Sequence, residues 1–267
     1  MPLAVCATPI GNLDDVTLRL LEELRTADVI LCEDTRHTRV LLDRHGISAP
    51  RLLSYHEHNE ARRTSEVLPR LRAGERVALV SDAGMPGISD PGARLVAAAL
   101  EGGVPVTVLP GPSAVDTALV ASGFPAERYQ FLGFLPRGAR ALAALWEELA
   151  GWRHPVVAFE SPQRLPGTLR SLAEARPERE VAVCRELTKR FEEVVRGRAD
   201  EVAARFAEPP KGEITLVLGP GVGAVDSGAA VEAVGELVAA GLPRRRAADL
   251  VARLTGVARN ELYRRTL

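Results

Sequence analysis

Three segments rich in glycine, proline and short polar side chains each follow a run of apolar residues. The longest of them, 81–92, reads Ser-Asp-Ala-Gly-Met-Pro-Gly-Ile-Ser-Asp-Pro-Gly, and the others are 7–12 and 109–114. Glycine allows a backbone to approach a ligand closely, and proline stiffens the loop that holds it. Loops that follow parallel strands share one edge of the sheet, where ligands bind. We therefore expect a ligand site at this edge, with ordinary turns as the alternative for any single loop.

A second group of polar segments follows apolar runs in the rear half of the chain, at 159–164, 184–190 and 211–215. Polar side chains that gather at strand ends facing a cleft are typical of a functional site. A solvated sheet edge is the alternative for any one of them. The charged residues of this group that we expect at the cleft are Glu160, Arg185, Glu186 and Lys189.

Several common ligand and metal motifs are missing from the sequence. The dinucleotide fingerprint G-x-G-x-x-G does not follow the first apolar run, and no G-x-x-x-x-G-K-[ST] phosphate loop occurs. Residues 219–223, Gly-Pro-Gly-Val-Gly, lack the βαβ context of a dinucleotide site, so we interpret them as a linker. The sequence also lacks Cys-x-x-Cys pairs and a G-x-S-x-G elbow, which disfavours a structural metal site and a hydrolase of that type.

Short β-branched runs alternate with longer amphipathic segments along the chain. Helical periodicity marks segments such as 60–72 and 165–175 between the apolar runs. This alternation predicts an α/β fold with mainly parallel sheets. The expected strands are 3–10, 28–33, 51–55, 77–82, 104–109, 129–135, 155–160, 180–185 and 213–218.

The length of 267 residues suits two domains. The segment 122–125, Ser-Gly-Phe-Pro, divides the expected strands, so we expect α/β domains at 1–122 and 123–222 with a cleft between them. Helical stretches at 226–267 are expected to form a small appendage. We find no apolar run long enough to cross a membrane and no signal peptide. Three widely spaced cysteines suit a reducing cytoplasm.

The formal net charge of −1 argues, taken alone, against a nucleic-acid partner, because phosphate binding usually leaves a basic excess. The charge is unevenly spread, however. Residues 241–267 hold seven arginines against Asp249 and Glu261, about +5, while the rest of the chain carries about −6. A helical, arginine-rich appendage suits RNA, and a solvated helix face is the alternative.

The polar motifs, taken in order along nearly the whole chain, resemble the bacterial family of ribosomal RNA small subunit methyltransferase I. These enzymes are 2′-O-methyltransferases within the tetrapyrrole methylase superfamily. The resemblance implies S-adenosylmethionine as methyl donor and, as acceptor, the ribose of a decoding-centre cytidine in 16S ribosomal RNA, either free or in the small ribosomal subunit. It also implies two α/β domains with the cofactor between them, and a homodimer. The motifs that carry it are 7–13, 32–36, 81–92, 109–114, 133–137, 160–165 and 185–189.

The resemblance also implies which residues form the site. In the wider superfamily the cofactor contacts loops and strand ends that correspond here to Pro9, Asp82, Ala83, Gly84, Ile88, Ser113, Ala114, Phe159, Glu160, Arg185, Ile214 and Thr215. For RNA we expect arginines of the shared motifs and of the appendage, namely Arg36, Arg137, Arg164, Arg244, Arg245 and Arg246. Gln163 stands where the family usually has histidine, so no acid–base role is carried over to that position.

Methyl transfer from a sulfonium to a ribose hydroxyl is an in-line displacement in which the hydroxyl proton must leave. We expect Lys189 to accept this proton, with a pKa that burial or cationic neighbours lower toward neutrality. The alternative for Lys189 is a cation that binds phosphate. Glu186 and Asp90 are the other candidates for the base.

Two other functions stay open on the same scaffold, a methyltransferase for a tetrapyrrole precursor and a non-catalytic ligand sensor. The arginine-rich appendage argues against the first, because a porphyrin enzyme has no evident use for it. The polar residues opposite the cofactor loops argue against the second.

Overall fold

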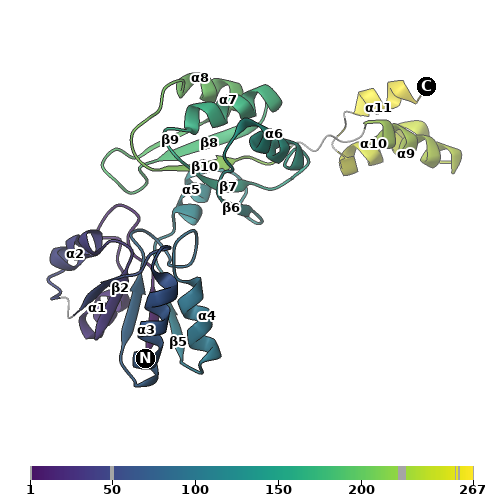
Figure 1. Cartoon of the computed structure of the whole chain (residues 1–267). Coiled ribbons are helices and arrows are strands. Elements are labelled where there is room, and N and C mark those ends of the chain that lie inside the picture. The colour runs from purple at the N-terminus through teal and green to yellow at the C-terminus, as the bar shows by residue number, and fades with distance from the viewer. Residues whose placement is uncertain (1, 49–50, 222–226, 256, 258, 267) are drawn as a thin grey trace.

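The computed structural model describes residues 2–48, 51–221, 227–255, 257 and 259–266. Figure 1 shows two α/β domains, one above the other, and a small helical appendage that stands apart from both. Residues 222 and 223 of the predicted linker, and residue 226, where we expect the appendage to begin, lie outside the described residues. Within the described part of the linker, Gly221 donates its N–H to the Trp152 carbonyl at 2.6 Å, which ties it to the second domain.

The first domain is a parallel five-stranded sheet with helices on both faces. Its strand order is β3-β2-β4-β1-β5, and every neighbouring pair is parallel. Alternate residues of β1 face opposite sides, because Ala4 and Cys6 pack in the cluster with α1 and α2, and Leu3 and Val5 in the cluster with α3 and α4. The elements are β1 (Leu3–Cys6), α1 (Leu18–Thr26), β2 (Val29–Cys32), α2 (Thr35–Arg44), β3 (Leu52–Ser54), α3 (Glu60–Arg72), β4 (Val77–Val80), α4 (Ala93–Glu101), β5 (Val106–Leu109) and α5 (Ala114–Ser122).

The second domain contains a mixed sheet, which corrects the prediction of mainly parallel sheets. Its strand order is β6-β7-β10-β8-β9, and only β6 and β7 are parallel. Strand β9 is not predicted from the sequence. The connection 186–192 between β8 and β9 is too short for a parallel crossover, which needs a dozen or so residues, so the two strands form an antiparallel hairpin. The elements are β6 (Gln130–Phe134), α6 (Ala139–Glu148), β7 (Val156–Glu160), α7 (Leu165–Ala175), β8 (Glu180–Arg185), β9 (Glu193–Arg198), α8 (Ala199–Arg205) and β10 (Ile214–Leu218).

Helix α5 packs on the second sheet, although it follows the last strand of the first. Leu119 of α5 shares a buried cluster with Val157 of β7 and Val217 of β10. Figure 1 shows α5 at the junction between the two domains. Judged by packing, the chain therefore crosses between the domains in the loop 110–113, before α5. From the sequence we expect the boundary later, at 122–125.

A contact between two loops holds the domains together beside this junction. Residues 11–12, after β1, meet residues 187–189, after β8, and we call this the loop contact. The Asn12 N–H donates to Oγ1 of Thr188 at 2.9 Å. A Cβ added at Gly11 would lie 2.5 Å from Cγ of Lys189 and 2.8 Å from the Leu187 carbonyl oxygen. Only glycine fits at position 11, because these distances are shorter than side-chain carbons tolerate.

The appendage is a three-helix unit with its own small core. It comprises α9 (Ser227–Ala239), α10 (Arg244–Thr255) and α11 (Arg259–Arg265). Val234, Val251 and Leu262 are buried against one another, one from each helix. None of the helices in the described part of the chain combines the length and the apolar character that a bilayer span requires.

The loop contact generates a first prediction. We expect Gly11→Ala to lower the free energy of unfolding by about 1–3 kcal/mol, because the added methyl group overpacks the contact. The melting temperature in a thermal unfolding experiment should fall by several degrees. Gly167→Ala is the matched control, since a Cβ there meets nothing within 4 Å and alanine favours helix α7. An unchanged melting temperature for Gly11→Ala would show that the loops tolerate separation.

Candidate functional site

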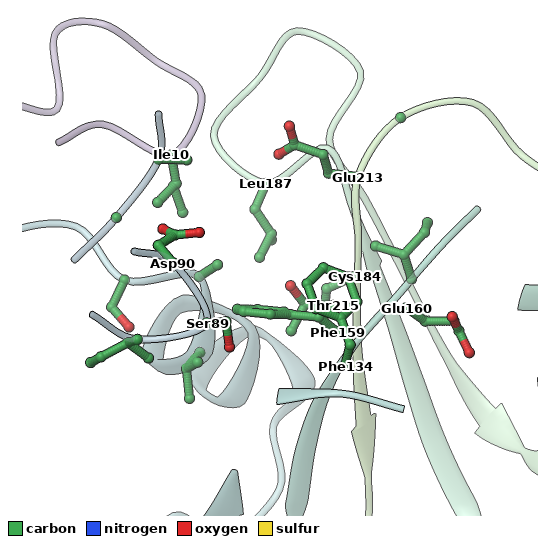
Figure 2. A pocket seen from close by; sticks show the side chains of 18 of the residues that line it. Ile10, Ser89, Asp90, Phe134, Phe159, Glu160, Cys184, Leu187, Glu213 and Thr215 are labelled. Atoms are coloured by element: carbon green, nitrogen blue, oxygen red, sulfur yellow. The ribbon is translucent and has the colours of Figure 1, made fainter. Parts of the chain in front are cut away.

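A cleft of about 470 Å³ lies between the two domains, where the loops that follow the strands face one another. Its volume is within the range of about 300–1,000 Å³ that is typical of ligand pockets. In Figure 2, Ile10, Ser89 and Asp90 of the first domain face Leu187 and Thr215 of the second. The residues expected to hold a cofactor that line this cleft are Ala83, Gly84, Ile88, Ser113, Ala114, Phe159, Glu160, Ile214 and Thr215.

One wall of the cleft is aromatic. The rings of Phe134 and Phe159 meet edge to face with centroids 5.6 Å apart, and Phe131 packs on Phe159 at 5.1 Å. Phe134 is 62% exposed and lines the cleft. Exposed aromatic rings in a cleft offer a surface on which a flat heterocycle can pack.

The charged residues that line the cleft are acidic. Among the described residues of the lining these are Asp90, Glu213 and Glu160, of which Glu160 turns its carboxylate away, and lysine, arginine and histidine are absent. Phosphate groups bind where arginine, lysine or several backbone N–H groups converge. The side chains of this lining therefore offer no cation to a phosphate group, and their charge favours a ligand with a positive charge.

Hydrogen bonds fix the loop 81–92 against the loop after β1. The Thr8 N–H donates to the Gly84 carbonyl at 2.9 Å, and the Gly84 N–H donates to the Thr8 carbonyl at 3.1 Å. The Thr8 hydroxyl donates to the Ser81 carbonyl at 3.0 Å. Farther along the loop, Ser89 has φ of 62°, a conformation that residues other than glycine seldom adopt. Strained backbone of this kind is concentrated at binding sites.

Asp90 presents a carboxyl group with an altered acidity to the cleft. Burial raises the pKa of this carboxyl to about 6, and the negative charge of Glu33 adds to the increase. Figure 2 shows the Asp90 side chain on the first-domain side of the cleft. At neutral pH the group is therefore mainly ionised but easily protonated.

The Glu160 carboxylate serves the turn between β7 and α7 instead of the cleft. It accepts hydrogen bonds from the Ser161 N–H, from Nε of Arg164 and from the Thr168 hydroxyl, each at 2.6 Å. The side chain of Glu160 is fully buried, and Figure 2 shows its carboxylate directed away from the other labelled side chains. Its contribution to the cleft therefore comes from the backbone.

Lys189 does not have the lowered pKa that the sequence analysis predicts. Its Nζ lies 2.9 Å from Oε1 of Glu186 and 3.1 Å from Oε2 of Glu213. Burial by itself would lower the pKa of the ammonium group, but the two carboxylates outweigh this effect and raise the pKa above its usual value. The neighbours are acidic where the prediction required cations, so Lys189 stays protonated and suits the alternative, a cation that binds phosphate.

A second pocket of about 330 Å³, the adjoining pocket, shares Ile10, Ala83 and Glu213 with the cleft. It lies between the loops after β1 and β4 and the residues of the loop contact. The expected site residues that line this pocket, besides Ala83, are Pro9, Asp82 and Lys189. The structure therefore places most of the expected site residues around two adjacent cavities.

Arg185 and Glu186 are not among the described residues that line either cavity. Nε of Arg185 donates to Oε2 of Glu193 at 3.1 Å, and Nη1 donates to the Lys211 carbonyl at 3.1 Å. Glu186 accepts the N–H of Glu213 at 3.0 Å. Both side chains join the ends of β8 and β9 to the segment that leads into β10.

The arginines expected to bind RNA lie in different environments. Arg36 forms an ion pair with Asp34 at 2.5 Å and is highly exposed, and Arg137 is also exposed. Arg164 is held by Glu160 and by the Leu135 carbonyl, so its guanidinium is committed to the β7–α7 turn.

The three consecutive arginines of the appendage begin helix α10. Arg245 and Arg246 are exposed, and Arg244 is half-buried. Arg246 lines a surface hollow together with Asp249 and Arg253.

We do not predict a site role for Phe134, Leu187 or His37 from the sequence, although each lies in or beside a polar motif. The signal that could have identified His37 is its position one turn after Asp34, the N-cap of α2 at the end of a strand. Within the described part of the chain, no group of three acidic, histidine or cysteine side chains could hold a metal ion.

Comparison with known proteins identifies both parts of the chain. Residues 2–203 match the family of Tetrapyrrole (Corrin/Porphyrin) Methylases, and residues 225–267 match the RsmI C-terminal HTH domain. Ribosomal RNA small subunit methyltransferase I of Mesorhizobium japonicum is 45% identical over 99% of this chain and 91% of its own length. The protein of the same name from Thermotoga maritima is 48% identical over 81% of this chain and 97% of its own length.

Solved structures share the fold at low sequence identity. Uroporphyrin-III-C-methyltransferase from Thermus thermophilus aligns with a TM-score of 0.59 and 22% identity, over 81% of this chain and 93% of that one. The same enzyme complexed with S-adenyl homocysteine aligns with a TM-score of 0.56 and 20% identity, over 81% of this chain and 96% of that one. The fold, the family matches and the full-length relatives agree, and the chain belongs to the ribosomal RNA small subunit methyltransferase I family of tetrapyrrole methylases.

Proposed function

We propose that this protein transfers a methyl group from S-adenosylmethionine to the 2′-oxygen of a cytidine ribose in the decoding centre of 16S ribosomal RNA. Family membership supports the reaction class. The observation that carries the choice of donor is the cleft, whose described lining holds carboxylates and no basic side chain. S-adenosylmethionine is a phosphate-free nucleoside cation that supplies an electrophilic methyl group, so it matches this lining.

The residues of the cleft suit each chemical part of this cofactor. The rings of Phe134 and Phe159 offer a packing surface for adenine. Asp90 supplies negative charge that favours a cation, whereas the Glu213 carboxylate is paired with Lys189. The full set that we propose for cofactor binding is Ala83, Gly84, Ile88, Ser113, Ala114, Phe159, Ile214 and Thr215, with Glu160 acting through its backbone.

The appendage is the part of the chain that we propose for binding the RNA backbone. Arg244, Arg245 and Arg246 lie together at the start of α10, in a unit whose formal charge is positive while that of the two domains is negative. Arginine side chains bind phosphate through a planar fork of donors. This arrangement separates the positive surface that RNA requires from the acidic cleft that the cofactor requires.

We further propose a cytoplasmic homodimer that acts on 16S ribosomal RNA or on the small ribosomal subunit. The resemblance to the bacterial family supports this assembly and this compartment.

A methyl-transfer assay with labelled S-adenosylmethionine tests the proposed function. We expect label in small ribosomal subunits or in 16S RNA, and mass mapping should find it as a 2′-O-methylcytidine. A tetrapyrrole precursor and a small subunit that already carries the modification are the controls, and neither should accept label. Transfer to the tetrapyrrole, or transfer to no substrate at all, would contradict the proposal.

The acidity of Asp90 predicts a pH-dependent gain in stability for Asp90→Asn. Because the folded-state pKa of about 6 lies above the value of about 3.9 in an unfolded chain, ionisation of Asp90 destabilises the fold as the pH rises through 6. We expect Asp90→Asn to melt about 2–4 °C above the wild type at pH 7.5, for a screened effect of about 1 kcal/mol.

The difference in melting temperature should shrink at pH 5, where Asp90 is mainly protonated. Asp43→Asn, which removes an exposed carboxylate, provides a matched control and should melt close to the wild type. Binding of S-adenosylmethionine, measured by calorimetry, should weaken in Asp90→Asn because the cleft loses a negative charge. Equal melting temperatures of Asp90→Asn and the wild type at pH 7.5 would show that burial does not destabilise the Asp90 carboxylate.

A further inference from the structure

The adjoining pocket contains a histidine paired with a carboxylate, a combination that accepts protons in many enzymes. Nδ1 of His37 lies 3.0 Å from Oδ2 of Asp82. Both residues line the pocket, and the side chain of His37 is 68% exposed. We propose that His37 is the base that accepts the proton of the ribose 2′-hydroxyl and that Asp82 is its positioning residue, an inference that rests on the proposed function.

The carboxylate of Asp82 is itself held in place. Its Oδ1 accepts the backbone N–H of Asp34 at 2.9 Å, while Oδ2 faces His37. Asp34 caps the helix that carries His37, because its side chain accepts the N–H of Arg36 at 2.8 Å. The end of β4 and the start of α2 are therefore joined through Asp82, which fixes the position of the imidazole ring relative to the loop 81–92.

This arrangement decides which nitrogen of His37 is available. An ionised carboxylate can only accept a hydrogen bond, so in the neutral ring Nδ1 carries the hydrogen and its N–H donates a hydrogen bond to Asp82. Nε2 then holds the lone pair. When Nε2 takes up a proton, the carboxylate of Asp82 stabilises the resulting imidazolium, as the aspartate of a catalytic triad does.

The adjoining pocket is positioned so that a methyl acceptor bound there would meet the methyl donor at a wall that the two cavities share. Ile10, Ala83 and Glu213 line both cavities, so a nucleotide in the adjoining pocket would lie next to the cofactor cleft. Lys189 enters the same pocket from the second domain. Protonated Lys189 is paired with Glu186 and Glu213, so it would hold a phosphate group of the RNA strand by exchanging one of these carboxylates, while His37, on the first domain, faces the ribose.

The chemical step balances with these groups. The 2′-oxygen forms a bond to the methyl carbon, the carbon–sulfur bond breaks and its electron pair stays on sulfur. The hydroxyl proton passes to Nε2 of His37, which later releases it to water. The other candidates are less suitable, because Lys189 is already protonated and Asp90 is proposed to face the cation in the cleft.

Several charged groups lie around His37. Glu33, Asp34 and Arg36 come from the same β2–α2 segment, and Asp82 comes from the end of β4. The second domain contributes Lys189 and Glu213 to the pocket. A pH profile must therefore be compared with variants, because a single curve would combine these effects.

The test measures single-turnover methyl transfer against pH for the wild type, His37→Gln, Asp82→Asn and Asp90→Asn. We expect His37→Gln to lose activity by about 10²–10⁴-fold, the usual contribution of a positioned base. The dissociation constant for S-adenosylmethionine should stay within about threefold of the wild-type value. The fall of the rate at acidic pH should persist in Asp90→Asn and vanish from the residual rate of His37→Gln.

Chemical rescue and a control complete the test. Imidazole added to His37→Gly should restore part of the activity, which a purely structural role of His37 would not allow. His58→Gln, an exposed histidine outside both cavities, should behave as the wild type. A His37→Gln rate within threefold of the wild type would overturn the inference but not the proposed function. So would a fall of the rate at acidic pH that is unchanged in His37→Gln. Failure of the wild type to methylate any ribose overturns the proposed function and the inference together.

Discussion

The close approach of two loops at Gly11 is the constraint on which both cavities depend. The loop after β1 can reach the loop after β8 only because residue 11 has no side chain, and the hydrogen bond from Asn12 to Thr188 then joins the two domains. Helix α5 supports the same junction, because it follows the first sheet in the chain but packs on the second. The walls of the cleft come from different domains, so their spacing is set by these two contacts.

The two adjacent cavities differ in charge, and this difference organises the proposed chemistry. The described lining of the cleft is acidic and aromatic, which suits a cationic nucleoside without phosphate. The adjoining pocket contains protonated Lys189 and the pair of His37 and Asp82, which suits an RNA strand whose ribose must lose a proton. Ala83 and Ile10 form part of the boundary between the two.

Much of the fold could be predicted from the sequence, because the apolar runs and their polar loops report local structure. The prediction was wrong where the outcome depends on which elements pair in space: the sheet of the second domain is mixed, and β9 follows a connection too short for a crossover. The motifs located the cleft, but they could not show that the Glu160 carboxylate points toward helix α7, where it accepts a hydrogen bond from Thr168. Nor could they show that Glu186 and Glu213 surround Lys189. Those facts depend on side-chain directions that spacing along the chain does not contain.

The absence of basic side chains from the described lining should make the cleft select a cationic nucleoside. This selectivity can be measured by calorimetric titration of the 267-residue chain with S-adenosylmethionine and, in parallel, with ATP. We expect one S-adenosylmethionine bound per chain and an affinity for ATP that is at least about a hundredfold weaker, or about 2.7 kcal/mol. Equal affinity for the two ligands would contradict it.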